Sequence, residues 1–253
     1  MSQLVNADFT GMVMFAKNHR ENDLLVKFLT REYGKRMFFI KNAKKKDFKL
    51  RSAILPFTHG RYSGLIRGNG LSYINAALDV KQFENIFQDI ELNAYATFLL
   101  NLVDAAFDDN FKIEAWFDRL ARALTLIDAG NDAEVITDLI QIQLLNSFGI
   151  AIVWDHCVVC GRRDLALDYS ESRGGMLCQN HWHLDEHRWH LSVKAAKTMA
   201  MLSLVSIFKL GQISVSPATK REIWQLTERI YQDQVGINLK SRHFIDQMQN
   251  WAH

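Results

Sequence analysis

The chain has 253 residues with a formal net charge of +2, and 48% of them are hydrophobic and 23% charged. This composition is typical of a globular protein, with enough length for one large domain or two modest ones. Its apolar runs are short and interrupted, which excludes a membrane-spanning segment. The N-terminus has no basic region followed by an apolar stretch, so we expect no signal peptide and a cytoplasmic protein.

The small net charge conceals a division along the chain. Residues 1–80 carry fourteen Lys and Arg against six Asp and Glu, whereas residues 81–150 carry four against twelve. A basic head joined to an acidic body predicts a polyanion-binding module fused to a second part. We therefore expect one domain at 1–80 and another at 81–253.

The first eighty residues have the pattern of a β domain. Short apolar or mixed runs alternate with stretches rich in Gly, Asn and Lys, and we interpret Gly60 and Gly64 as turn residues. About five short strands at this spacing predict a small barrel or sandwich. The expected strands are 10–16, 23–30, 36–40, 53–57 and 71–77.

From about Val80 the apolar residues recur at helical spacing, which predicts a mostly helical body and an α+β fold for the whole chain. Gly130 follows the second predicted helix as its stop. Ser216 and Pro217 have the pattern of an N-cap followed by proline at the first helical position. The expected helices are 82–107, 112–129, 132–148, 192–210, 216–234 and 239–251.

All three cysteines of the chain fall in one arrangement with a histidine: a C-x-x-C pair, seventeen residues, and a C-x-x-H pair. This is the spacing of a structural zinc site built from two knuckles, with four protein ligands and no open position. His156 and His183 are alternative fourth ligands. We predict a zinc-knuckle insert at about 150–190 with these ligands: Cys157, Cys160, Cys178 and His181.

Other interpretations of the cysteines are inert core thiols, which pack as small hydrophobes, and a redox C-x-x-C, which needs a strand-to-helix setting that is missing here. A catalytic zinc would need an open position and a nearby base. The chain has neither the G-x-x-x-x-G-K-[ST] motif of a nucleotide-binding P-loop nor the G-x-S-x-G motif of a serine nucleophile. Four acidic residues could be considered as a metal-dependent nuclease cluster, but we interpret them as solvated helix ends and loops: Asp89, Glu91, Asp108 and Asp109. We therefore expect that the protein is not an enzyme.

Residues 35–51 contain eight basic residues and one acidic residue, with Phe38, Phe39 and Phe48 interleaved. On a small barrel this predicts a groove that follows a nucleic-acid backbone, with rings for base stacking. The alternative is a solvated loop over core phenylalanines, and at least one of Phe38 and Phe39 is expected inside because strand neighbours point to opposite faces. The predicted nucleic-acid-binding residues are Lys35, Arg36, Lys41, Lys44, Lys45, Lys46, Lys49 and Arg51.

In their order along the chain, these features resemble the RecO family of bacterial recombination mediators. Four stretches that together span nearly the whole length carry the resemblance: 20–35, the basic run to Arg51 with 55–57 after it, 144–161 with Cys178 and His181, and 239–244. This chain has His181 where many zinc-bearing members have a fourth cysteine. The resemblance implies an N-terminal five-stranded OB barrel and a helical C-terminal domain with a zinc-finger insert.

The resemblance also implies what the protein does. Family members bind single- and double-stranded DNA and anneal complementary strands. With RecR and the single-strand DNA-binding protein as partners, they help load RecA, which places the protein at the nucleoid. The alternative from another class is a zinc-knuckle transcription or RNA-binding factor, which would need a basic metal segment, but residues 155–190 carry four basic and six acidic residues.

Overall fold

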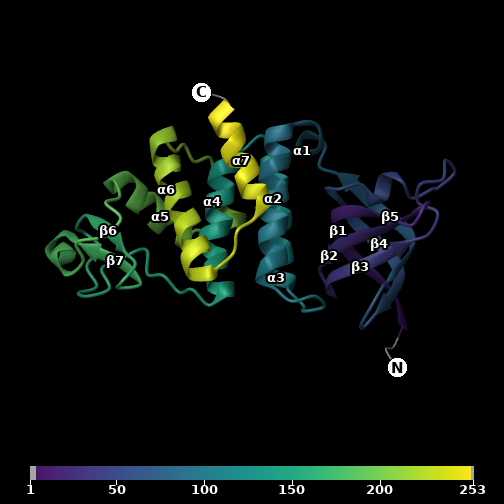
Figure 1. The fold of residues 1–253 in the computed structure, drawn as a ribbon, viewed down its shortest axis with the longest axis horizontal. Coiled ribbons are helices and arrows are strands. Elements are labelled where there is room, and N and C mark those ends of the chain that lie inside the picture. The colour runs from purple at the N-terminus through teal and green to yellow at the C-terminus, as the bar shows by residue number, and fades with distance from the viewer. Residues whose placement is uncertain (1–3, 252–253) are drawn as a thin grey trace. The chain divides into compact units, whose positions relative to one another are not determined.

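The computed structural model describes residues 4–251, which form two compact units (Figure 1). The first unit comprises the chain up to Ala129 together with the residues from Ile245 on, and the second comprises Gly130–Phe244. Three helices therefore belong to the same unit as the N-terminal sheet, and the domain boundary at residue 80 stays a prediction. Within residues 4–251 no helix has the length and apolar character needed to cross a membrane.

Five antiparallel strands form the sheet of the first unit, in the order β3-β2-β1-β4-β5. A parallel bridge pairs Phe38 of β3 with Ser72, and the Phe39 N–H donates to the Ser72 carbonyl at 2.9 Å. The two outer strands thus meet without a continuous ladder, so the barrel is not closed. This is the partly open arrangement of an OB fold. The strands are β1 (Leu4–His19), β2 (Asp23–Thr30), β3 (Gly34–Ile40), β4 (Thr58–Arg67) and β5 (Tyr73–Gln82).

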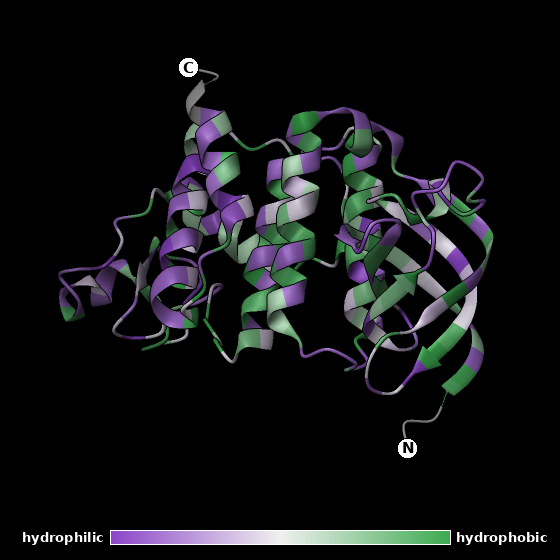
Figure 2. Ribbon diagram, turned by 45° about the vertical axis from the view of Figure 1, so that its right-hand side comes forward, coloured by the Kyte–Doolittle hydropathy of each residue, from purple (hydrophilic) through white to green (hydrophobic). Residues whose placement is uncertain are grey.

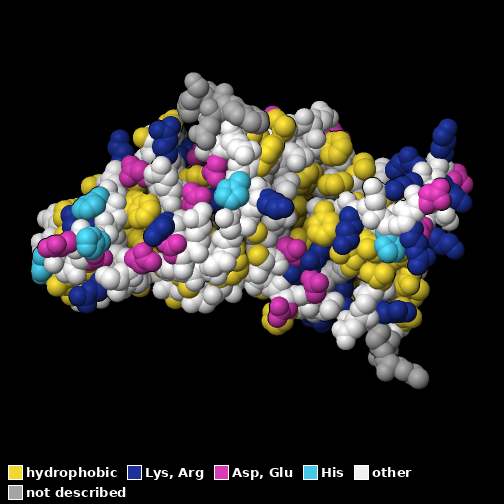
Figure 3. All heavy atoms as spheres, viewed as in Figure 1, with side chains coloured by type: hydrophobic (Ala, Val, Ile, Leu, Met, Phe, Trp, Pro, Cys, Tyr) yellow, Lys and Arg dark blue, Asp and Glu magenta, His cyan; other side chains and the backbone are white. Residues whose placement is uncertain are grey.

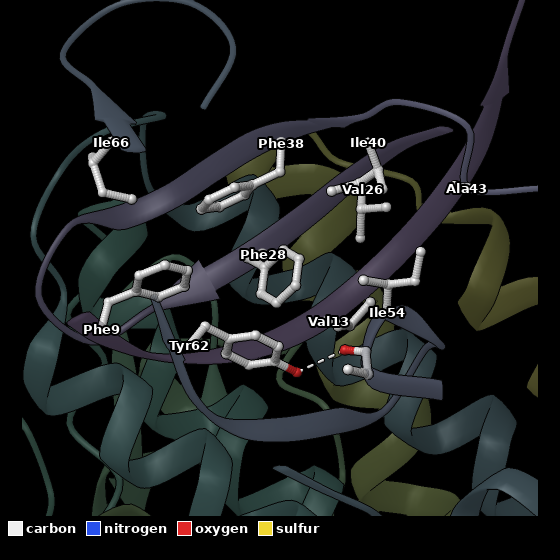
Figure 4. Packing of buried hydrophobic residues seen from close by; sticks show 11 residues of the cluster. Phe9, Val13, Val26, Phe28, Phe38, Ile40, Ala43, Ile54, Tyr62 and Ile66 are labelled. Carbon is white, nitrogen blue, oxygen red and sulfur yellow. Dashed lines mark hydrogen bonds between the residues drawn. The ribbon is translucent and has the colours of Figure 1, made fainter. Parts of the chain in front are cut away.

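Aromatic rings fill the inside of this sheet, because alternate residues of each strand point to the same face. Phe9 stacks on Phe38 and on Tyr62, with ring centroids 5.3 and 5.7 Å apart, and Phe28 meets Phe38 edge to face at 4.9 Å. Tyr62 is fully buried, and its hydroxyl donates to the Ala53 carbonyl at 2.8 Å (Figure 4). Phe38 is therefore a core residue.

One of the five predicted strands is wrong. Residues 53–57 lie in a turn that begins with the short 3-10 helix η1 (Ser52–Ile54), and β4 starts only at Thr58. Ala53 and Ile54 are buried in the core, which gives this turn the apolar composition of a strand. The other four predicted strands overlap β1, β2, β3 and β5.

Gly60 and Gly64 lie inside β4 rather than in turns. A Cβ atom on Gly60 would lie 2.0 Å from the Asp79 carbonyl oxygen, and one on Gly64 would lie 2.3 Å from the Tyr73 carbonyl oxygen. Glycine at both positions lets β5 approach β4 closely, where the pairing shifts register. The glycines therefore mark close approach of two strands, not chain reversal.

The first unit contains three whole helices, α1 (Glu84–Gln88), α2 (Ile90–Ala106) and α3 (Glu114–Asp128), and the part of α7 (Lys240–Trp251) from Ile245 on. The single helix predicted over 82–107 is broken at Asp89, whose backbone is extended. The Asp89 side chain accepts hydrogen bonds from the N–H groups of Glu91 and Leu92, so it ends one helix and caps the next. Figure 2 shows hydrophobic residues on the strands and helices and mostly hydrophilic residues on the loop after β3.

The second unit is mostly helical, as expected, and also contains a small hairpin that the sequence analysis did not predict. Arg242 at the start of the last helix stacks over Trp224, with its guanidinium carbon 3.8 Å from the ring centroid, and donates to Gln141 Oε1 at 3.1 Å. These contacts join three helices through one buried cation. The elements are α4 (Ala133–Leu144), η2 (Leu145–Phe148), β6 (Leu167–Ser170), β7 (Gly175–Cys178), η3 (Gln179–Leu184), α5 (Val193–Leu204), η4 (Ile207–Lys209), α6 (Pro217–Ile230), η5 (Tyr231–Val235) and the beginning of α7 (Lys240–Trp251).

Candidate metal centre and nucleic-acid surface

The first predicted knuckle, Cys157–Cys160, is a tight turn held against the β6–β7 hairpin. The Gly161 N–H donates to the Cys157 carbonyl at 2.8 Å, and the Val158 N–H donates to the Met176 carbonyl of β7 at 2.9 Å. Gly161 has φ +72°, a conformation that favours glycine. The second knuckle begins at Cys178, the last residue of β7, and continues into η3. The hairpin therefore brings the two knuckles together.

The four predicted ligands meet in one cluster, with all donor atoms within 4.8 Å of one another. The Cys160 and Cys178 sulfurs are 3.8 Å apart, and His181 Nδ1 lies 3.5 Å from the Cys157 sulfur and 3.3 Å from the Cys178 sulfur. A tetrahedral zinc ion with ordinary bond lengths separates two sulfurs by about 3.8 Å and a sulfur from a nitrogen by about 3.5 Å. The residues therefore fit a four-coordinate metal ion.

The electrostatics of the cluster also suit a cation. Burial disfavours the Cys157 thiolate, but neighbouring backbone groups, first that of Cys178, outweigh it and lower the pKa of Cys157 to about 6. Burial raises the pKa of Cys178, because its charged form is poorly solvated and lies beside other thiols. A divalent cation removes this penalty, and thiolate is the form that binds metal.

The other histidines of the segment are less well placed. His156 Nδ1 pairs with Asp155 Oδ1 at 2.7 Å, and His183 is exposed, with its ring centroid 6.3 Å from that of His181. Of the described residues in this segment, only His181 joins the three cysteines in the cluster. The geometry thus favours His181 over the two alternatives.

Six of the eight predicted nucleic-acid-binding residues are exposed on the loop between β3 and η1, which we call the lysine loop (residues 41–51). Arg51 braces this loop, because its Nη2 donates to the carbonyls of Lys44 and Lys45 at 3.2 and 2.6 Å. Figure 3 shows Lys and Arg side chains gathered at the loop end of the sheet, on the right of the view. The exposed six are Lys41, Lys44, Lys45, Lys46, Lys49 and Arg51.

The other two predicted residues, Lys35 and Arg36, are buried. The Lys35 ammonium lies 2.9 Å from Asp104 Oδ1 and 3.4 Å from Asp109 Oδ1. Arg36 donates to three main-chain carbonyls, among them that of Arg67 at 2.8 Å, and burial lowers its pKa. Both cations are committed to contacts inside the first unit, and their role in nucleic-acid binding stays a prediction.

The three phenylalanines of the segment have different positions. Phe38 is in the core, and Phe48 is half-buried against it. Phe39 lies on the outer face of β3, edge to face with His19 at 5.8 Å and with Tyr73 at 6.2 Å between centroids. His19 and Tyr73, which the sequence analysis did not single out, therefore lie beside a ring of the basic segment.

Comparison with known proteins covers both parts of the chain. A family model described as "Recombination protein O N terminal" matches residues 1–83, and one described as "Recombination protein O C terminal" matches residues 87–243. A protein named "DNA repair protein RecO" from Pediococcus pentosaceus is 76% identical over 251 residues, which cover 99% of both chains. Proteins of the same name from Limosilactobacillus reuteri and Latilactobacillus sakei are 52% and 49% identical, over 98% and 95% of this chain and 95% and 89% of theirs.

Proposed function

Because this chain belongs to the RecO family of DNA repair proteins, we propose that it is a recombination mediator that binds single- and double-stranded DNA and anneals complementary strands. With RecR, it helps load RecA onto DNA coated with single-strand DNA-binding protein, in the cytoplasm at the nucleoid. The observation that carries the DNA-binding proposal is the exposed lysine loop on an OB-type sheet.

The lysine loop suits a role that needs no covalent chemistry. Lys44, Lys45 and Lys46 are exposed, and none of them has an ion-pair partner among the described residues. Lysines bound to phosphates release counterions and reduce the repulsion between two strands, so pairing becomes faster without a nucleotide cofactor. The expected activity is therefore strand annealing that needs no ATP and weakens as salt rises.

We further propose that the Cys157–His181 cluster holds one structural zinc ion. Thiolate and imidazole donors at tetrahedral spacing are the ligand set and geometry that zinc prefers. All four positions are taken by protein, which leaves none for a substrate or water. The ion would hold the two knuckles together and keep the insert folded.

Annealing of complementary oligonucleotides, bare and coated with single-strand DNA-binding protein, tests the function. The test variant carries Lys44→Glu, Lys45→Glu and Lys46→Glu. The matched control carries Lys194→Glu, Lys197→Glu and Lys209→Glu, three exposed lysines of the second unit. Both variants change the net charge equally, so a difference between them reports the position of the charges.

The proposal predicts that the loop variant anneals much more slowly than wild type, without ATP, and that the control variant anneals at close to the wild-type rate. Equal slowing in both variants would mean that only net charge matters. Wild-type protein that fails to accelerate annealing under any salt condition would overturn the proposed activity.

A further inference from the structure

The outer face of the sheet carries a group of aromatic rings beside the lysine loop. Phe39 is half-buried between His19, near the end of β1, and Tyr73, at the start of β5, which are also half-buried. The three rings come from three different strands, so the curvature of the sheet and the Phe38–Ser72 bridge bring them together. We call this group the aromatic face (His19, Phe39 and Tyr73).

Two exposed lysines flank the aromatic face. Lys17 pairs with Leu25, and Leu25 pairs with Phe39, so these three side chains form a row on the same face of the sheet. Two strand spacings place Lys17 about 10 Å from Phe39 along this row, and Lys41 follows Phe39 by two residues, or about 7 Å. One cation therefore lies across the strands from the Phe39 ring and the other follows it along the chain, so both can contact phosphates while the ring contacts a base.

An acidic side chain beside this group, that of Asp23, accepts a main-chain hydrogen bond. Asp23 pairs with His19 across β1 and β2, and its Oδ1 accepts the Asn42 N–H at 2.8 Å. This bond ties the start of the lysine loop to β2, the strand between those that carry Phe39 and His19. The rings and the lysine loop therefore form one continuous surface on the first unit.

We propose that the aromatic face is a stacking subsite for unpaired nucleobases, so that this surface binds single-stranded DNA more tightly than its charge alone provides. The inference rests on the proposed DNA-binding function and deepens it. Every base offers a flat face to an aromatic ring, so stacking adds affinity without sequence preference. In a duplex these faces are already stacked and paired, and a protein on its surface meets mainly phosphates and groove edges.

The two parts of the surface therefore have separate roles. The lysine loop contacts phosphates, which are present in both forms of DNA. The aromatic face contacts bases, which are free only in single strands. An annealing protein benefits from this difference, because it loses the stacking contacts when the duplex forms and is released more readily from its product.

The test separates base from phosphate by using three DNA probes: a thymidine oligomer, an abasic oligomer with the same number of phosphates, and a duplex. Stacking predicts that wild-type protein binds the thymidine oligomer about 5- to 150-fold more tightly than the abasic one. Phe39→Leu, which keeps an apolar side chain, should bring this ratio close to one and leave duplex affinity unchanged. Phe39→Tyr, which keeps a ring, should preserve the ratio.

The controls distinguish stacking from general loss of structure. Phe111→Leu removes an aromatic ring that is 61% exposed elsewhere on the first unit, and should leave all three affinities unchanged. Lys44→Glu should weaken binding to all three probes alike. Equal wild-type affinity for thymidine and abasic oligomers, or equal losses on single strands and duplex in Phe39→Leu, would overturn the inference and leave the proposed function standing. Wild-type protein that binds none of the probes would overturn the proposed function itself.

Discussion

Lys35 of β3 and Asp104 of α2 are joined twice: the Lys35 ammonium lies 2.9 Å from the Asp104 carboxylate and also donates to the Asp104 main-chain carbonyl at 2.6 Å. Lys27 of β2 reaches the same carboxylate oxygen at 2.6 Å. The side chains of Lys35 and Lys27 are only 4% and 11% exposed. Asp104 is therefore the charge that allows two ammonium groups to be buried between the sheet and a helix of the first unit.

Replacing Asp104 with Asn is expected to destabilise the first unit by about 2–4 kcal/mol, because two buried cations lose their nearest countercharge. Urea unfolding followed by circular dichroism measures this loss. The control is Asp108→Asn, at an exposed position of the following loop, which should unfold at the wild-type urea concentration. Equal stability of the two variants would contradict a structural role for the Lys35–Asp104 pair.

Asp109 lies beside the same two lysines and makes the stability of the first unit depend on pH. Its Oδ1 lies 3.3 Å from the Lys27 ammonium and 3.4 Å from that of Lys35. Desolvation disfavours its charge, but the two ammonium groups outweigh this and hold the pKa of Asp109 below its ordinary value of 3.8. A carboxylate with a depressed pKa stabilises the fold above its unfolded pKa, and this stabilisation is lost as pH falls through the folded pKa.

The measurement compares wild type with Asp109→Asn over a pH series. The difference between their free energies of unfolding should be constant above about pH 5 and should shrink as pH falls below 3.8. A difference that grows in acid would show the opposite sign of the pKa shift. The other titratable groups are common to both proteins, so a change in the difference reports the Asp109 carboxylate.

Local patterns predicted the metal cluster because its four ligands lie within one short segment of chain. The C-x-x-C and C-x-x-H spacings place two donors each on a tight turn, and one hairpin brings the turns together. Strand alternation likewise predicted that one of Phe38 and Phe39 would be inside, and Phe38 is. These inferences needed no knowledge of distant partners.

The burial of Lys35 and Arg36 depends mainly on distant partners. Asp104 lies 69 residues after Lys35, and two of the three carbonyls that Arg36 binds lie 31 and 32 residues away, at the end of β4 and just after it. The basic run in the sequence therefore contains two cations that are buried and six that are exposed. The interpretation of Gly60 and Gly64 as turn residues was wrong for the same reason. These glycines are required by the close approach of β5, which follows later in the chain.

The fourth metal ligand is a prediction that a single substitution can test. His181→Ala should lose the bound zinc, because His181 Nδ1 is the nitrogen that lies 3.3 and 3.5 Å from two cysteine sulfurs. His156→Ala and His183→Ala should retain about one zinc per chain. Metal analysis after dialysis measures the content, and cobalt(II) reconstitution reports tetrahedral geometry through its absorption.

Loss of metal should also lower stability, since the binding free energy of a structural ion is partly folding free energy. A chelator should therefore lower the melting temperature of wild type but not that of His181→Ala. Equal zinc content in all three histidine variants would contradict a Cys3His site and leave the cysteines as the only ligands.

We predict different effects on the salt dependence of DNA binding for substitutions in the lysine loop and for a substitution at Lys35. Neutralising Lys44, Lys45 and Lys46 together with Gln removes up to three phosphate contacts. The slope of log affinity against log salt should then become shallower by about 2 for single strands and by about 3 for duplex DNA. Stability should stay close to wild type, because all three side chains are exposed.

Lys35→Gln is the matched variant, since it removes one cation that the ion pair with Asp104 already neutralises. It should destabilise the first unit but leave the salt slope unchanged, because no counterion is released from a buried ammonium group on DNA binding. Affinities are measured by titration of labelled oligonucleotides over a range of salt concentrations, at a temperature where both variants are folded. A shallower slope for Lys35→Gln would show that Lys35 leaves its ion pair to reach phosphate. An unchanged slope for the triple variant would move the DNA contact away from the lysine loop.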